Sequence, residues 1–197
     1  MSLNTIAEKI AFFLVQKQIV EKEQIEIYSF GLEILIATCF NGVLVLLTAI
    51  ALGVAAQTFF MLIPFMLIRS KAGGFHAKTH MGCITGFMVI YLASIFIIRV
   101  LPIETMQIVS IFELFICITI MIGIGSINHE NRSVTELEYS NFKKASRTIT
   151  IILFVLGLLG IYYFPQWFIY YVVGLCMAAG SLLVAWIIRK KKEDEKV

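Results

Sequence analysis

Long apolar runs separated by short polar stretches define the architecture that this sequence predicts. No charged residue occurs between Ile34 and Ile68. This run is too long for one membrane crossing, which needs about 20 residues, but two crossings fit it with a tight turn near Gly53–Gln57. Four further apolar runs follow, at residues 82–101, 105–127, 148–163 and 167–188. The pattern predicts an all-α polytopic membrane protein with about six transmembrane helices.

The first 27 residues follow a different pattern, in which charged and apolar side chains interleave. Thr5-Ile-Ala-Glu8 matches a capping box that starts a helix. Apolar residues recur at three- and four-residue spacing, at Leu3, Ile6, Ile10 and Phe13. An amphipathic helix in the membrane interface and an ordinary packed helix both fit this spacing. We expect a single domain with an amphipathic interfacial segment at 1–27, a transmembrane body at 28–188 and a charged tail at 189–197.

Composition agrees with a membrane protein. Hydrophobic residues make up 59% of the 197 residues, charged residues make up 15%, and the mean hydropathy is +0.90. Soluble globular chains average about 45–50% apolar and about 25% charged residues. Most of the surface is therefore expected to face lipid.

The distribution of positive charge predicts the orientation. Six crossings place both termini on one side of the membrane, and that arrangement puts every one of the 16 Lys and Arg residues except Arg99 on the same side as the termini. Basic residues accumulate on the cytoplasmic side of membrane proteins. We therefore expect a multi-pass protein of the cell membrane, with both termini and the polar loops in the cytoplasm.

One polar segment, Arg69–Cys83, contains cations, a glycine pair, two histidines and a cysteine between two apolar runs. A thiol close to an imidazole and to cations forms a reactive thiolate more readily, so His76 and Cys83 are candidates for a catalytic dyad. On a straight helix these two residues would lie about 10 Å apart along the axis. A bend or a helix start must separate them, and Gly82 or a helix cap by Thr79 would provide it.

Three other functions fit parts of the sequence. A zinc-dependent membrane hydrolase would use His76, His80 and Cys83, but Lys78 lies between the histidines and no carboxylate is near. A non-enzymatic transporter or peptide exporter would carry paired ionisable residues near the membrane centre, where we find only Glu113. A basic loop that orients the protein and touches anionic lipid is the simplest explanation on these residues alone.

A third catalytic group is not fixed by the sequence. No Asp occurs before Asp194, so a third member would be a Glu, an Asn or a backbone carbonyl. The possible side chains are those of Glu113, Asn128 and Glu130. The other cysteines lie inside apolar runs, where a free cysteine behaves as a small hydrophobic residue, and we assign no role to Cys39, Cys117 and Cys176.

Two blocks of the sequence resemble a known family. Arg69-Ser-Lys-Ala-Gly-Gly-Phe-His76, with Cys83 seven residues later, is similar to the accessory gene regulator protein B (AgrB) family of bacterial membrane cysteine endopeptidases, which process quorum-sensing pro-peptides. Asn128-His-Glu-Asn-Arg132, followed by Lys143-Lys144, looks like the family's second polar loop. The resemblance covers nearly the whole chain. Gly125-Ser-Ile127 departs from it, because many members carry a proline there.

The resemblance implies roles for these residues. Cys83 would be the nucleophile, and His76 would act as its base and then as an acid. Substrate binding or oxyanion support would come from Arg69, Lys71, Gly73, Gly74, Lys78, Lys143 and Lys144.

The resemblance also implies the reaction and the partners. The enzyme would remove the C-terminal tail of a small AgrD-like pro-peptide, which has an amphipathic leader and an acidic tail. The acyl group on Cys83 would pass to an internal Cys or Ser of the peptide and close a thiolactone or lactone ring. A homodimer is implied, and no cofactor, metal or nucleic acid is expected.

Overall fold

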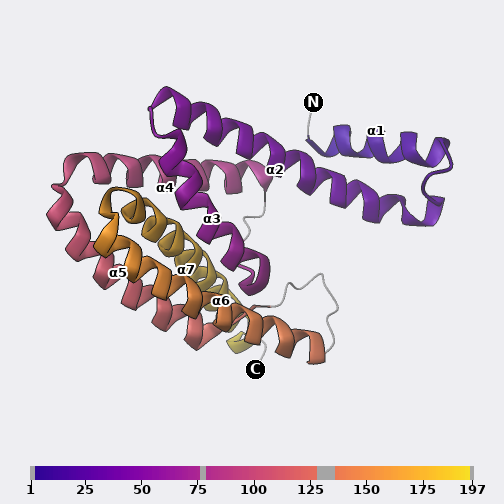
Figure 1. Cartoon of the computed structure of the whole chain (residues 1–197). Helices are drawn as coiled ribbons and strands as arrows, with labels where there is room; N and C mark the ends of the chain where they lie inside the picture. Colours follow the sequence, from indigo (N-terminus) through magenta and orange to yellow (C-terminus); the bar gives the residue numbers. More distant parts are fainter. Residues whose placement is uncertain (1–2, 76–78, 128–135, 196–197) are drawn as a thin grey trace.

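A computed structural model describes residues 3–75, 79–127 and 136–195, and every regular element in these ranges is a helix (Figure 1). Helix α1 (Leu3–Gln16) and the short 3-10 helix η1 (Lys22–Gln24) come first. The long helices that follow are α2 (Ile25–Ala51), α3 (Ala55–Ala72), α4 (His80–Val100), α5 (Ile103–Ile124), α6 (Glu136–Tyr163) and α7 (Pro165–Asp194).

Five helices, α2, α4, α5, α6 and α7, are long and apolar enough to cross a membrane. Helix α3 lies outside this set, because Arg69 and Lys71 in its last turn lower the mean hydropathy of its 18 residues. Many large apolar side chains point outward, and Phe96 and Phe112 are 68% and 66% exposed. An outward apolar surface suits a helix bundle that lipid surrounds. The prediction of an all-α polytopic membrane protein is confirmed.

The best-packed part of the molecule consists of α3, α5, α6 and α7, and α7 touches the other three. One buried apolar cluster joins the four helices through residues that include Ile68, Leu114, Leu153 and Val172. Helix α7 crosses α3 at Gly174, where an added Cβ atom would lie 1.9 Å from the carbonyl oxygen of Met61. Only glycine lets the two backbones approach this closely.

Helix α4 lies against α3 through contacts between side chains. The hydroxyl oxygens of Thr58 on α3 and Tyr91 on α4 lie 2.8 Å apart in a buried hydrogen bond. The rings of Phe65 and Phe87 have centroids 5.4 Å apart. From the first pair to the second, the residue number rises on α3 and falls on α4. The two helices are therefore antiparallel.

Helix α1 packs on the first half of α2, away from the other helices (Figure 1). The packed face consists of small residues, since Ala7 and Ala11 are fully buried. Ile10 and Phe13, which belong to the predicted apolar stripe, are 38% and 54% exposed. The stripe therefore faces outward and leaves an apolar surface for lipid, which agrees with an amphipathic segment in the membrane interface.

Positive charge gathers at one end of the bundle. Consecutive helices alternate in direction, so the end of α3, the start of α6 and the end of α7 share that end, and these segments carry Arg69, Lys71, Lys143, Arg147 and Arg189–Lys192. Arg99 lies at the opposite end, where it donates a hydrogen bond to the carbonyl of Leu52 in the turn between α2 and α3. This separation agrees with the charge asymmetry found in the sequence.

The α3–α7 crossing gives a testable expectation. Gly174→Ala should destabilise the protein by about 1–3 kcal/mol, because its methyl group would meet the Met61 backbone and force the helices apart. Gly180→Ala is the matched control, since nothing lies within 4 Å of a Cβ atom at that position of the same helix. Thermal unfolding in detergent should show a lower midpoint for Gly174→Ala alone. Equal midpoints for both variants would contradict the close crossing.

Candidate active site

The segment that follows α5 holds the end of α3 in place. The backbone N–H of Ile127 donates to the carbonyl of Ala72 at 2.9 Å, and the Ser126 hydroxyl donates to the carbonyl of Lys71 at 3.0 Å. The last carbonyls of a helix lack partners within it, so these bonds satisfy two groups that would otherwise be unpaired. The end of α3 is therefore tied to the end of α5.

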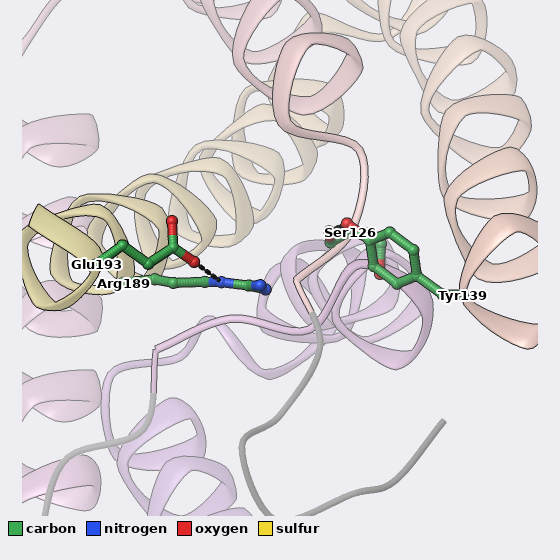
Figure 2. A network of polar contacts seen from close by, with 4 residues as sticks. All are labelled: Ser126, Tyr139, Arg189 and Glu193. Atoms are coloured by element: carbon green, nitrogen blue, oxygen red, sulfur yellow. Dashed lines mark hydrogen bonds and ion pairs between the residues drawn. The ribbon is translucent and has the colours of Figure 1, made fainter. Parts of the chain in front are cut away.

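Helix α6 supports this segment from the other side. Tyr139 reaches from α6 and donates its hydroxyl to the carbonyl of Ser126 at 2.9 Å, as Figure 2 shows. The buried Ser146 hydroxyl donates to the carbonyl of Gly125 at 2.7 Å. Figure 2 also shows Arg189 and Glu193, which form an ion pair of 2.9 Å near the end of α7. Helices α3, α5 and α6 thus meet where α3 ends.

The glycine pair after α3 is required by the protein's own contacts. Gly73 has a φ of 77°, and an added Cβ would lie 2.8 Å from the carbonyl oxygen of Ile127. Gly74 has a φ of 154°, and its Cβ would lie 2.5 Å from Ser181 Oγ and 3.0 Å from Arg69 Nη1. Side chains are strained in such conformations and have no room here. The pair therefore allows the chain to lie directly against α7 and the 125–127 segment.

Arg69 joins the chain after α3 to α7. Its Nη1 donates to Ser181 Oγ at 2.6 Å, and its Nη2 donates to the carbonyl of Phe75 at 2.9 Å. The backbone N–H of Phe75 donates to both the hydroxyl and the carbonyl of Ser181, at 3.1 and 3.0 Å. A guanidinium presents its donors in a rigid fork, so one side chain fixes two partners at once.

Cys83 lies in the first turn of α4. The Thr79 side chain caps this helix by accepting a hydrogen bond from the backbone N–H of Gly82 at 3.1 Å, and the N–H of Cys83 donates to the Thr79 carbonyl at 3.1 Å. The predicted helix start between His76 and Cys83 is thus confirmed at Thr79. The Cys83 side chain is half-buried and lies at the positive end of the dipole of α4.

Arg69 and Cys83 lie within electrostatic reach of each other. Arg69 follows Phe65 by four residues and Cys83 precedes Phe87 by four, so each lies one turn beyond the ring contact between α3 and α4. Burial lowers the pKa of the Arg69 guanidinium, and the charge of Cys83 raises it. The site therefore brings together a half-buried sulfur, a fixed cation and a helix N-terminus.

Two of the predicted lysines, Lys71 and Lys143, lie around the 125–127 segment that holds the end of α3. The Lys71 ammonium lies 5.7 Å from the centroid of the Phe142 ring. The aliphatic part of Lys143 covers Gly125, whose added Cβ would lie 2.8 Å from Lys143 Cγ, and Lys144 is exposed. Gly125 has a φ of 76°, which proline cannot adopt. A proline would therefore not fit at position 125.

Glu113 lies outside the network of contacts around Arg69 and the 125–127 segment. It lies in the middle of α5, about 18 Å along the helix from Gly125, and its side chain lies near Cys176 on α7. The sulfur atoms of Cys176 and Cys117 lie 3.3 Å apart. Glu113 thus belongs to a separate cluster within the bundle.

Some predicted site residues lie outside the described part of the chain. They are His76, Lys78, Asn128 and Glu130, together with the side chain of His80. Sequence reasoning missed Ser181, Ser126 and Tyr139, which make the contacts just described. One signal was available for Ser181. It is a polar residue in the last apolar run, two turns before the basic residues that follow.

These features define a multi-pass helical membrane protein with a half-buried thiol within electrostatic reach of an arginine at the basic end of its bundle. Residues 7–188 match the family described as accessory gene regulator B, and the chain belongs to that family.

A stretch of 60 residues is 33% identical to protein FsrB of Enterococcus faecalis. The match covers 30% of this chain and 25% of that protein, so the chain spans about a quarter of this relative's length. No solved structure matches the chain.

Proposed function

We propose that this protein is a membrane cysteine endopeptidase that removes the C-terminal tail of a small autoinducer pro-peptide and cyclises the remainder. The observation that carries the proposal is Cys83 in the first turn of α4, within electrostatic reach of the fixed Arg69 guanidinium. A cysteine thiol is an intrinsically strong nucleophile, and the Arg69 charge and the positive end of α4 suit the negative charge that develops near the sulfur during attack.

The first half of the reaction forms an acyl-enzyme. The Cys83 sulfur attacks the carbonyl carbon of the scissile peptide bond, and the carbonyl oxygen gains negative charge. When the carbon–nitrogen bond breaks, the tail leaves as an amine and takes a proton. In this proposal the proton comes from His76, which received it from the thiol. The leader and the future ring remain on Cys83 as a thioester.

The second half transfers the acyl group within the peptide. An internal Cys or Ser of the substrate attacks the thioester carbonyl, a new thioester or ester bond closes the ring, and Cys83 regains a proton. Water would hydrolyse the intermediate instead, so the site has to limit its access. The half-buried position of Cys83 supports this requirement.

Substrate recognition is proposed to rest on charge and on the membrane. Lys71, Lys143, Lys144 and Arg147 lie at the same end of the bundle as Cys83 and suit an acidic tail. We place this end in the cytoplasm on the positive-inside rule. An amphipathic leader would be concentrated at the bilayer surface, where the outward stripe of α1 also lies.

The nucleophile is tested by co-expression with a pro-peptide and mass spectrometry of the products. Cys83→Ala should leave the precursor intact, because the attacking sulfur is lost. Cys39→Ala, Cys117→Ala and Cys176→Ala should still release the tail, since these cysteines lie away from the Arg69 network. Tail release by Cys83→Ala would refute the mechanism. Release that a chelator abolishes would favour a zinc hydrolase, and a peptide moved with its tail attached would favour a transporter.

Tail recognition is tested by charge reversal at an exposed lysine. Lys144→Glu should raise KM for the pro-peptide more than it lowers kcat, because the loss affects binding of the acidic tail rather than bond breaking. Lys9→Glu on α1 is an exposed control and should change neither value. A fall in kcat with an unchanged KM would contradict the proposed role.

A further inference from the structure

Ser181 on α7 is the point at which two separate parts of the candidate site meet. Its hydroxyl oxygen accepts from Arg69 Nη1 at 2.6 Å and from the backbone N–H of Phe75 at 3.1 Å. A serine hydroxyl oxygen has two lone pairs, so these two donors use its full capacity as an acceptor. One atom on α7 therefore fixes both a side chain of α3 and the backbone that continues toward α4.

The helix that carries Ser181 is the most firmly held in the bundle. Helix α7 touches α3, α5 and α6, and its backbone meets α3 directly at Gly174. Helix α4, which carries Cys83, makes fewer contacts with the rest of the bundle. Ser181 therefore ties Arg69, near the end of α3, to the most firmly held helix.

The contacts around Ser181 leave little freedom for another arrangement. Gly74 has no side chain at the point where a Cβ would lie 2.5 Å from Ser181 Oγ and 3.0 Å from Arg69 Nη1. The second arm of the Arg69 fork donates to the Phe75 carbonyl at 2.9 Å, which closes a ring of contacts between these residues. Removing the hydroxyl would take away the Ser181 acceptor of Arg69 Nη1 and leave the Phe75 N–H with the Ser181 carbonyl alone on α7.

We propose that Ser181 is a positioning residue for the chemistry of Cys83, because it holds the Arg69 guanidinium on the same side of the Phe65–Phe87 contact as Cys83 and fixes the Phe75 backbone on α7. This inference rests on the proposed function. Ser181 acts through Arg69 and the chain after α3. Loss of the Ser181 hydroxyl should therefore displace the Arg69 guanidinium and the chain after α3 relative to Cys83, while the helix bundle stays folded.

Two measurements test this role. The first is the rate at which iodoacetamide alkylates Cys83 at neutral pH, without substrate, in a variant whose other cysteines are alanine. The second is the kcat and KM of tail release from the pro-peptide. Ser181→Ala should slow alkylation severalfold and lower kcat by up to about 100-fold with a smaller change in KM, as expected for a misplaced catalytic group. Ser181→Thr keeps the hydroxyl and should restore most of both.

Matched variants separate positioning from folding. Gly180→Ala, next to Ser181, has open space for its methyl group, and Ser94→Ala removes a hydroxyl that donates to Ile90 within α4. Both should behave as the parent protein does. Gly74→Ala would place a methyl group against Ser181 Oγ and Arg69 Nη1. It should reproduce the Ser181→Ala defect at a similar thermal midpoint.

The outcomes distinguish this inference from the proposed function. An unchanged alkylation rate and kcat in Ser181→Ala would overturn the positioning role, as would a loss of activity that only tracks a fall in folded protein. Alkylation needs no substrate, so it reports on Ser181 even if Cys83→Ala still releases the tail. That last result would refute the peptidase mechanism and leave the measured effect of Ser181 on Cys83 intact.

Discussion

The close crossing of α3 and α7 is the constraint on which the candidate site depends. Gly174 lets α7 approach the backbone of α3 at Met61, where a single methyl group would not fit. From this crossing, Arg69 lies eight residues further along α3 and Ser181 lies seven residues further along α7. Both distances are about two helical turns, so the crossing brings the guanidinium and the hydroxyl together at the basic end of the bundle.

The chain around the thiol is then fixed from several sides. The segment after α5 caps the end of α3, Tyr139 on α6 holds that segment, and Thr79 starts α4 so that Cys83 falls in its first turn. The glycine pair at 73–74 lets the connecting chain lie against these partners. In this arrangement the glycines serve the protein's own packing, which is a simpler reason for them than a close approach of substrate.

Much of this architecture was predictable from the sequence, because apolar runs of sufficient length must be helices in lipid and because Thr79 is a good helix cap. The helix start that the spacing of His76 and Cys83 required lies at Thr79. Ser181 was not predictable in the same way. It lies in an apolar run, and its partners Arg69 and Phe75 are more than 100 residues away in the sequence.

The N-terminal helix shows a similar limit. The apolar spacing identified an amphipathic helix, but the face that packs on α2 is the small-residue pair Ala7 and Ala11 rather than the large apolar stripe. Small residues give little signal in a hydrophobic pattern, yet they let helices approach closely. Glu113 illustrates the reverse case, since its charge attracted attention and its contact is with Cys176 inside the bundle.

Trapping of the acyl-enzyme tests the central claim most directly. A pro-peptide whose internal Cys or Ser is replaced by alanine cannot close the ring, so the reaction should stop at the thioester. Mass spectrometry of the digested enzyme should then find the tailless peptide attached to Cys83, and hydroxylamine should release it. Tail release without any adduct on Cys83, or an adduct on another residue, would contradict the account.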